Sequence, residues 1–109
     1  MDNRDRELLL EFKNRLPADL KGHLEKLIVF GSRAGGTQTD DSDLDIAVLV
    51  DRKTDEIEKG FEDVAYAVMW DNDFRTMLSI KILETSRFQD ALGKGYSFYK
   101  HIESDGVLV

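Results

Sequence analysis

The sequence predicts a mixed α/β (α+β) fold in which a small sheet of three or four strands is flanked by helices. Short apolar runs typical of buried strands alternate with segments whose apolar residues recur at helical spacing. Of the 109 residues, 41% are hydrophobic and 34% are charged, a composition typical of globular rather than disordered proteins. That length suffices for one core, so we expect a single domain over residues 1–109.

The first part of the chain predicts two helices followed by a strand. Residues 4–16 carry an apolar stripe at helical spacing and are expected to form a helix. Pro17 then begins a short helical or turn segment that reaches His23. The apolar run over residues 27–30 is typical of a short buried strand, which Gly31 ends.

The middle of the chain predicts a second strand and a long helix. Residues 44–50 are rich in Val, Ile and Leu and are expected to form a buried strand. Thr54 is expected to be an N-cap, because two acidic residues follow it at the start of an apolar pattern with helical spacing. That pattern predicts a helix to about residue 69.

The last part of the chain predicts a turn, a third strand and two short helices. Residues 70–73 are expected to form a turn and residues 77–83 a strand. Ser86, with Gln89 three residues later, predicts a capping box for a helix through residue 92. Residues 97–104 are expected to form a last short helix.

The charge and composition exclude several classes of function. The net charge of −7 makes nucleic acid a poor partner and fits a basic protein or a site for metal cations better. There are no cysteines, and the two histidines lie far apart, which argues against disulfides and a zinc site. No apolar run approaches the roughly 18 residues of a membrane span, and the charged start does not resemble a signal peptide. We therefore expect a cytoplasmic protein.

The stretch "VFGSRAGGTQTDDSDLDIAVLV", residues 29–50, carries the strongest signal for a functional site. Side chains alternate along a strand, so Asp43 and Asp45 are expected on one face, where two carboxylates can hold hard divalent cations. Two such metals about 3.5–4 Å apart can clamp the attacking and leaving oxygens of a phosphoryl displacement. Gly31 permits a tight turn, Ser32 and the next amides can hold phosphate at a helix start, and Arg33 adds positive charge.

Other interpretations of this stretch fit less well. A Walker loop needs Lys where the chain has Thr37, and the G-x-G-x-x-G fingerprint is absent. A calcium-binding hand that starts at Asp41 needs Gly and Glu where the chain has Ile46 and Arg52. The structural alternative is a polar loop whose aspartates cap a helix or face water.

The order Gly-Ser, ten residues, then Asp-x-Asp resembles the signature of the minimal nucleotidyltransferases, within the polymerase-beta-like nucleotidyltransferase superfamily. The resemblance extends to "SRFQDA" and to the end of the chain, "FYKHIESDGVLV". It implies a small mixed sheet flanked by helices, ATP as substrate, Mg²⁺ bound by Asp43 and Asp45, and nucleotide held by Gly31, Ser32 and Arg33. Family members of this size often pair with a HEPN-domain ribonuclease toxin. They act as antitoxins by moving AMP from ATP onto a tyrosine of the toxin.

The chain departs from the family pattern at two places. Gly35 stands where the family commonly has Arg, and residues 77–83 contain no third carboxylate, although Glu84 follows them. A third acid usually helps to deprotonate the attacking hydroxyl, and a tyrosine phenol with a pKa of about 10 needs that help less than an aliphatic alcohol. Lys81 is expected near a phosphate if its side of the strand is the active one.

The missing acid fits a tyrosine acceptor and fits equally a non-catalytic module that neutralises its partner by binding. A nucleotidyltransferase with a small-molecule acceptor is the third alternative, and a homo-oligomer is also open.

Overall fold

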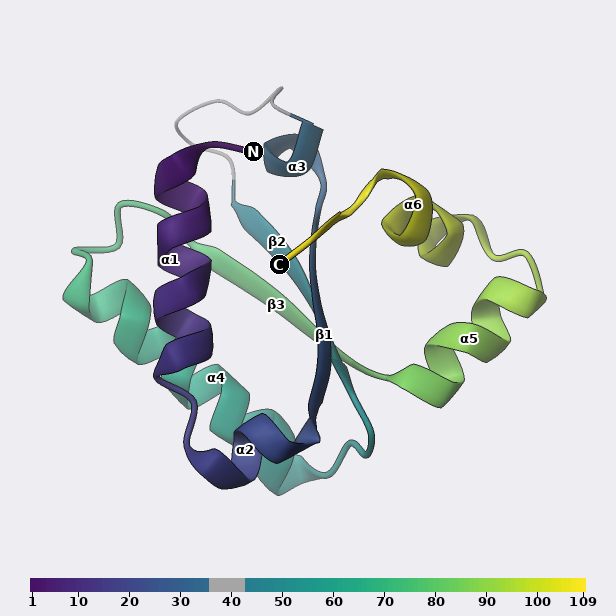
Figure 1. The fold of residues 1–109 in the computed structure, drawn as a ribbon, viewed down its shortest axis with the longest axis horizontal. Coiled ribbons are helices and arrows are strands. Elements are labelled where there is room, and N and C mark those ends of the chain that lie inside the picture. Colours follow the sequence, from purple (N-terminus) through teal and green to yellow (C-terminus); the bar gives the residue numbers. More distant parts are fainter. Residues whose placement is uncertain (36–42) are drawn as a thin grey trace.

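The computed structural model describes residues 1–35 and 43–109, and in these residues the chain forms six helices and four strands (Figure 1). The elements of the first half are α1 (Asn3–Asn14), α2 (Ala18–His23), β1 (Leu24–Phe30), α3 (Ser32–Gly35) and β2 (Leu44–Val50). Those of the second half are α4 (Asp55–Asp71), β3 (Leu78–Glu84), α5 (Thr85–Gly93), α6 (Ser97–Asp105) and β4 (Val107–Leu108).

The strands form one mixed sheet in the order β3-β2-β1-β4. The two central strands, β2 and β1, are antiparallel, and β4 also pairs antiparallel with β1. The edge strand β3 is parallel to β2, and α4 connects the two. This confirms the predicted mixed α/β class with a sheet of three or four strands.

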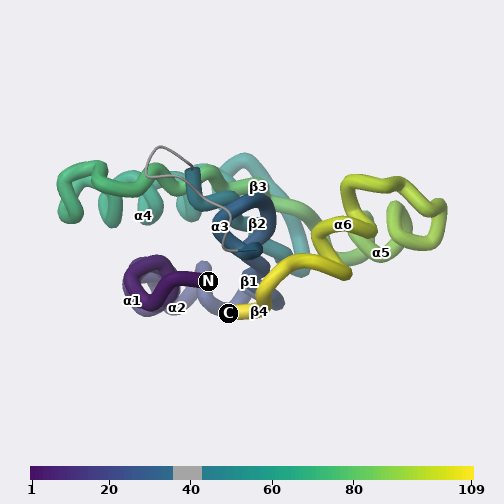
Figure 2. The backbone as a smooth tube through the Cα atoms, turned by 90° about the horizontal axis from the view of Figure 1, so that it is seen from above, coloured from purple at the N-terminus to yellow at the C-terminus, as the bar shows by residue number. Residues whose placement is uncertain are grey.

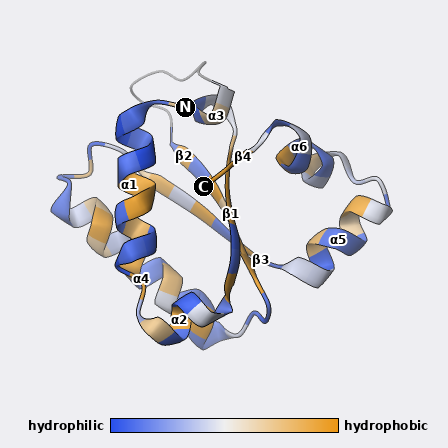
Figure 3. Cartoon of the chain, in the orientation of Figure 1, coloured by the Kyte–Doolittle hydropathy of each residue, from blue (hydrophilic) through white to orange (hydrophobic). Residues whose placement is uncertain are grey.

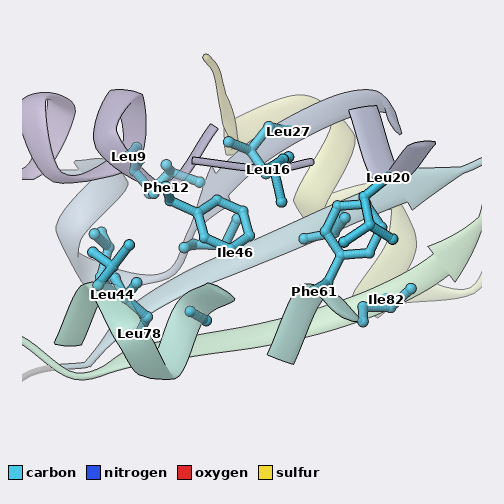
Figure 4. Close-up of a cluster of buried hydrophobic side chains, with 14 of the residues drawn as sticks. Leu9, Phe12, Leu16, Leu20, Leu27, Leu44, Ile46, Phe61, Leu78 and Ile82 are labelled. Atoms are coloured by element: carbon cyan, nitrogen blue, oxygen red, sulfur yellow. The ribbon is translucent and has the colours of Figure 1, made fainter. Parts of the chain in front are cut away.

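One face of the sheet is covered by α1, α2 and α4. Figure 2 shows these helices on one side of the strands, with α5 and α6 on the other. Side chains from the helices and strands meet in one large cluster, which Figure 4 shows at close range. Its fully buried members include Phe12 of α1, Phe61 of α4 and Ile46 of β2. The helices are amphipathic, as the alternating hydrophilic and hydrophobic bands along α1 and α4 show (Figure 3).

The opposite face of the sheet is covered by α5 and α6 over only part of its area. Phe88 of α5 and Ile102 of α6 pack on Ala47 and Leu49 of β2 and on the neighbouring side chains of β1. Because both faces of β2 are covered there, residues 46–50 are all buried. That explains why this strand has a continuous apolar run rather than an alternating pattern.

Several predicted boundaries agree with the structure and others do not. Thr54 is the N-cap of α4, as predicted, and its Oγ1 accepts a hydrogen bond of 3.1 Å from the amide of Ile57. The predicted cap at Ser86 is wrong, because the N-cap of α5 is Glu84, two residues earlier, and its side chain makes no cap hydrogen bond. The turn predicted at residues 70–73 begins too early, because α4 continues to Asp71.

The start of β1 also differs from the prediction, since the strand begins at Leu24 rather than at residue 27. Its first residues include exposed charged side chains, but their backbones pair with β2 across an irregularity in register between Leu24 and Lys26. In the described part of the chain, no helix has the length and apolar character needed to cross a membrane.

Candidate active site

Gly31 and Ser32 form the connection between β1 and the short helix α3. Gly31 has a φ of +78°, a left-handed conformation that glycine adopts at no steric cost. The chain turns there, and α3 begins at Ser32, with the amide of Ala34 bonded to the carbonyl of Gly31 at 3.2 Å. The predicted helix start after Gly31 is therefore present. Residues 36–42, which include Thr37 of the spacer, lie outside the described part of the chain.

The two aspartates lie at the start of β2, on the face of the sheet that α5 and α6 cover. Asp43 directly precedes the strand and is exposed, and Asp45 is its second residue and partly buried. In the registers of the sheet, Asp45 lies opposite Phe30 of β1 and beside Ser79 of β3. Because side chains alternate, Asp43 and Asp45 share the face of Ala47 but lie at its uncovered end.

Gly31 and Asp45 lie in direct contact. A Cβ placed on residue 31 would lie 2.6 Å from Oδ2 of Asp45, closer than real Cβ atoms approach another atom. Glycine at residue 31 therefore serves the turn and also leaves the space that the Asp45 carboxylate fills. The end of β1 and the start of β2 thus bring Gly31, Ser32 and Asp45 to one place, although they are separated in the sequence.

The surroundings of Asp45 disfavour its negative charge. Burial raises the pKa of the Asp45 carboxyl above its usual value, and the negative charge of Asp43 raises it further, while the Lys81 ammonium lowers it. The two carboxylates are thus close enough to repel one another. A cation between them would relieve that repulsion, which fits the predicted metal-binding role of the pair.

The family model described as polymerase beta, nucleotidyltransferase matches residues 18–101, which include β1, the Gly31–Ser32 turn and both aspartates. The chain belongs to the polymerase beta nucleotidyltransferase family. This confirms the family that the Gly-Ser and Asp-x-Asp pattern predicts.

Two curated relatives come from Methanocaldococcus jannaschii, and both are named as candidate protein adenylyltransferases. The first, MJ0604, is 38% identical over 47 residues, or 43% of this chain and 47% of the relative. The second, MJ0141, is 41% identical over 44 residues, or 40% of this chain and 44% of the relative. These matches span about half the length of the curated relatives.

Solved structures share the fold of this nucleotidyltransferase domain at low sequence identity. A candidate nucleotidyltransferase from Sulfolobus solfataricus superposes with a TM-score of 0.59 and 21% identity, covering 97% of this chain and 79% of that one. A toxin–antitoxin structure with AMP-PNP gives a TM-score of 0.54 and 20% identity, covering 95% and 70%. A mutant of the toxin–antitoxin pair MntA–HpeT gives 0.53 and 18%, with the same coverage.

In this nucleotidyltransferase domain, Lys81 is the basic residue of β3 on the aspartate face. The parallel register places Ser79 beside Asp45 and Lys81 beside Ala47, so alternation turns both toward that face. The Lys81 ammonium lies 6.0 Å from the centroid of the Phe98 ring, and Phe98 packs edge-on against Phe30 at 5.8 Å. The sequence left open which side of β3 Lys81 faces, and the register between β2 and β3 answers that question.

Arg33 has a structural role that its place beside Ser32 did not predict. Its Nη1 donates hydrogen bonds to both carboxylate oxygens of Asp5, at 2.9 and 3.1 Å, and both side chains are almost fully buried. This ion pair joins the first turn of α1 to α3. Its contribution to nucleotide binding stays a prediction, and no pattern in the sequence singled out Asp5.

Glu84 does not lie where a third catalytic carboxylate would be needed. It lies beside Val50 at the far end of β3, five residues from Ser79, or roughly 17 Å at about 3.4 Å per residue. There Oε2 accepts a hydrogen bond from the amide of Lys53, and Oε1 pairs with Arg87. Among the described residues, no group of three or more His, Cys, Asp or Glu side chains is arranged to hold a metal ion.

The structure also contains a cavity of about 590 Å³. It lies between α1, α3 and the turn after α4, with Arg4, Arg33 and Arg75 among its lining residues, and neither aspartate of β2 contributes to it. Acidic residues of α1 line it too, so its charges are mixed. The chemistry of the family motif therefore points to the Asp43–Asp45 end of β2 rather than to this cavity.

Proposed function

We propose that the chain is a Mg²⁺-dependent nucleotidyltransferase that moves AMP from ATP onto a tyrosine of a partner HEPN-type toxin, and so acts as an antitoxin. The observation that carries the proposal is the placement of the Asp45 carboxylate against Gly31, with Asp43 on the same uncovered face of the sheet. The family match and the candidate protein adenylyltransferases among its relatives support nucleotidyl transfer to a protein. The toxin–antitoxin pairs with the same fold support the antitoxin role.

The donor atoms at this site fit a divalent cation. Mg²⁺ is bound in proteins by one or two carboxylates together with waters and substrate phosphates, and Asp43 and Asp45 supply two carboxylates. Burial and then the negative charge of Asp43 raise the pKa of Asp45, and a cation between the two carboxylates would relieve their repulsion. When bound, Mg²⁺ supplies positive charge that offsets the charge developing on the transferred phosphoryl group.

The residues around the aspartates suit the triphosphate of ATP. The exposed Ser32 and the amides at the start of α3 would bind phosphate oxygens, and the turn at Gly31 lets the backbone approach them closely. Lys81 would add a positive charge from the neighbouring strand. The solved toxin–antitoxin structure with AMP-PNP, an ATP analogue, agrees with ATP as the donor.

We infer the kind of acceptor from the β3 residue that lies beside Asp45. In the transfer, the acceptor oxygen bonds to the α-phosphorus of ATP, the bond from that phosphorus to the pyrophosphate oxygen breaks, and the acceptor hydroxyl gives up its proton. The β3 residue beside Asp45 is Ser79, which cannot act as the carboxylate base. A tyrosine phenol, with a pKa of about 10, loses its proton far more readily than an aliphatic alcohol and is therefore the acceptor we propose.

The proposal is tested by incubating the chain with the product of the adjacent gene, ATP and Mg²⁺, followed by intact-mass and peptide mass spectrometry. We expect one or more AMP additions on tyrosine. The Asp43→Asn, Asp45→Asn variant should give none. Glu84→Gln, a matched loss of a carboxylate at the far end of β3, should transfer normally.

A second candidate function is a binding module that neutralises the toxin without modifying it. The observation that favours it is the serine beside Asp45, in a strand that has no carboxylate at that level. An unmodified toxin that is still neutralised in a stable complex would support this alternative and contradict the transferase. AMP on serine or on a small molecule would remove the argument from the missing base.

A further inference from the structure

The outer side of α4 and the turn that follows it carry four large apolar side chains in contact with solvent. Tyr66, Trp70, Phe74 and Met77 are 56%, 64%, 37% and 46% exposed, and we call them the aromatic patch. Single exposed apolar residues are common on protein surfaces, but a cluster of this kind is typical of an interaction site. The patch belongs neither to the core nor to the aspartate face.

The rings of the patch are arranged as one cluster. Tyr66 and Trp70 lie one helical turn apart, with ring centroids 6.4 Å apart, and Phe74 packs edge-on against both, at 5.7 and 6.0 Å. Three aromatic rings therefore support one another in water instead of filling the interior. Such a rigid aromatic surface needs little ordering on binding and is typical of interface anchors.

The backbone holds Phe74 in this cluster in an unusual conformation. Asp73 and Phe74 have φ values of +57° and +52°, a left-handed region that is uncommon for residues other than glycine and rarer still for a bulky one. The amide of Phe74 donates to the carbonyl of Met69 at 2.9 Å, which ends α4 and directs the ring back toward Trp70. Asp73 thus stands where glycine is usual after a helix, and the bulky Phe74 that follows it is left-handed too.

The aromatic patch lies at the same end of the sheet as the aspartates. Met77 precedes β3, and its carbonyl accepts a hydrogen bond of 2.8 Å from the amide of Leu44, the residue between Asp43 and Asp45. Because β2 and β3 are parallel, the starts of both strands meet at this end (Figure 1). A protein bound to the patch would therefore reach the edge from which Asp43 and Asp45 are approached.

The charge around the patch indicates which kind of partner protein is complementary to it. The helix α4 contains six acidic residues and one lysine, so it carries most of the chain's net charge of −7. Three of the acidic residues near the patch have basic partners: Asp63 pairs with Lys59 at 3.0 Å, Asp71 with Arg15 at 2.8 Å, and Asp73 lies 3.9 Å from Arg75. Glu62 adds a further negative charge on α4, so acidic residues outnumber basic ones around the patch, which is complementary to an apolar surface bordered by lysine and arginine.

We propose that the aromatic patch is the docking surface for a partner protein that presents apolar side chains bordered by basic ones, and that docking there brings the partner's acceptor residue to the aspartate end of the sheet. The second half of this inference rests on the proposed function, whereas docking itself does not. Docking at the patch would raise the local concentration of the partner's acceptor residue near Asp43 and Asp45, without any contact to the nucleotide-binding turn.

Trp70 is the only tryptophan of the chain, so its fluorescence reports on the patch directly. The probe is a synthetic amphipathic helix of leucine and lysine, about 18 residues long, and the control peptide has glutamate in place of lysine. Without ATP, we expect the lysine peptide to shift Trp70 emission to shorter wavelength in a saturable manner. The affinity should fall at least about tenfold when ionic strength rises from 0.05 to 0.5 M. The glutamate peptide should cause no shift.

Variants separate the patch from other exposed aromatic residues. Tyr66→Ala and Tyr66→Lys should each weaken the lysine peptide at least about fivefold, because they remove a ring from the centre of the patch. Tyr96→Ala removes an equally exposed ring at the start of α6, at 54% exposure, and should leave the affinity unchanged. Circular dichroism checks that each variant is folded, and the two different replacements at Tyr66 guard against one that is not.

Three results would overturn the inference. They are no emission shift with the lysine peptide, equal shifts with both peptides, and equal loss of affinity in the Tyr66 and Tyr96 variants. Trp70 emission that changes with protein concentration, without peptide, would instead assign the patch to a second copy of the chain. Since no ATP is present, a failure here leaves the transfer assay to decide the proposed function separately.

Discussion

The two faces of the sheet are built from alternate residues of the same strands, but helices cover β2 along one face and leave it open at one end of the other. On the covered face, Leu44, Ile46 and Val48 of β2 lie fully buried under α1 and α4. On the other face, Ala47 and Leu49 lie under α5 and α6, while Asp45 extends beyond that cover. Residues one position apart in the chain therefore lie in very different surroundings.

The difference between the two faces explains why two aspartates are tolerated at the start of a core strand. A buried, unpaired carboxylate would destabilise the fold by several kcal/mol. Here the alternation of the strand turns both carboxylates to the uncovered end, where water and ligands reach them. Substitutions on the covered face should therefore change stability, and substitutions at the open end should change binding and transfer.

The largest effect on stability should come from the covered face. Phe61→Ala removes a fully buried ring that lies 6.5 Å from the ring of Phe12, so the free energy of unfolding should fall by about 3–5 kcal/mol. Denaturant titration measures this change. The folded fraction should still bind Mg²⁺–ATP with its normal affinity. A loss of affinity without a loss of stability would contradict the separate roles of the two faces.

The next effect should come from the buried ion pair between α1 and α3. Asp5→Ala leaves the Arg33 guanidinium buried without its carboxylate and should lower stability by about 3 kcal/mol. Replacing both residues, Asp5→Leu with Arg33→Met, should recover most of that stability, since the buried charge is gone.

The double replacement also tests whether Arg33 binds nucleotide. We expect its affinity for Mg²⁺–ATP, measured by calorimetry, to fall about tenfold, or about 1.4 kcal/mol, through loss of the arginine charge. An unchanged affinity in a folded double variant would restrict Arg33 to its structural pairing with Asp5.

A similar effect on binding is expected at Lys81, with no effect on the fold. Lys81→Met removes the positive charge of β3 from the aspartate face and should weaken Mg²⁺–ATP up to about tenfold, which is 1.4 kcal/mol. Lys100→Met removes an exposed lysine of α6 and is the matched control. Equal affinities of the two variants would show that Lys81 does not contact the nucleotide.

The smallest effect is a pH-dependent change in stability at Asp45. Burial and Asp43 raise the pKa of this carboxyl, so its ionisation opposes folding. The loss of stability caused by this ionisation is absent below the unfolded-state pKa of about 3.9. It reaches its full size above the raised pKa of the folded state.

Asp45→Asn should therefore be the more stable protein at pH 7 in metal-free buffer, by less than about 1 kcal/mol because the site is partly solvated. The difference should disappear as the pH falls below about 3.9. Thermal unfolding at several pH values measures it. A variant that is less stable than the natural sequence at pH 7 would mean that the Asp45 carboxylate supports the fold.

Local patterns in the sequence predicted much of this structure. The apolar run of β2 and the cap at Thr54 depend on neighbouring residues, and both are confirmed. The face shared by Asp43 and Asp45 follows from strand alternation, which needs no knowledge of the partners of β2.

The features that sequence reasoning missed depend on contacts between distant segments. The two-residue strand β4 exists through pairing of Val107 and Leu108 with β1, and so short a segment has no pattern of its own. The ion pair of Asp5 and Arg33 joins residues 28 positions apart. The side on which Lys81 lies depends on the register between β2 and β3, which the spacing of residues along the chain does not give.

We expect the open end of the sheet to be a metal–nucleotide site built on Asp43 and Asp45 and not a structural feature. Calorimetric titration of ATP tests it most directly, with Mg²⁺ and with a chelator, on the natural sequence and on the Asp43→Asn, Asp45→Asn variant. We predict binding with Mg²⁺, at least about tenfold weaker binding without it, and none in the folded variant. Equal affinity with and without Mg²⁺, or a double variant that fails to fold, would contradict the claim.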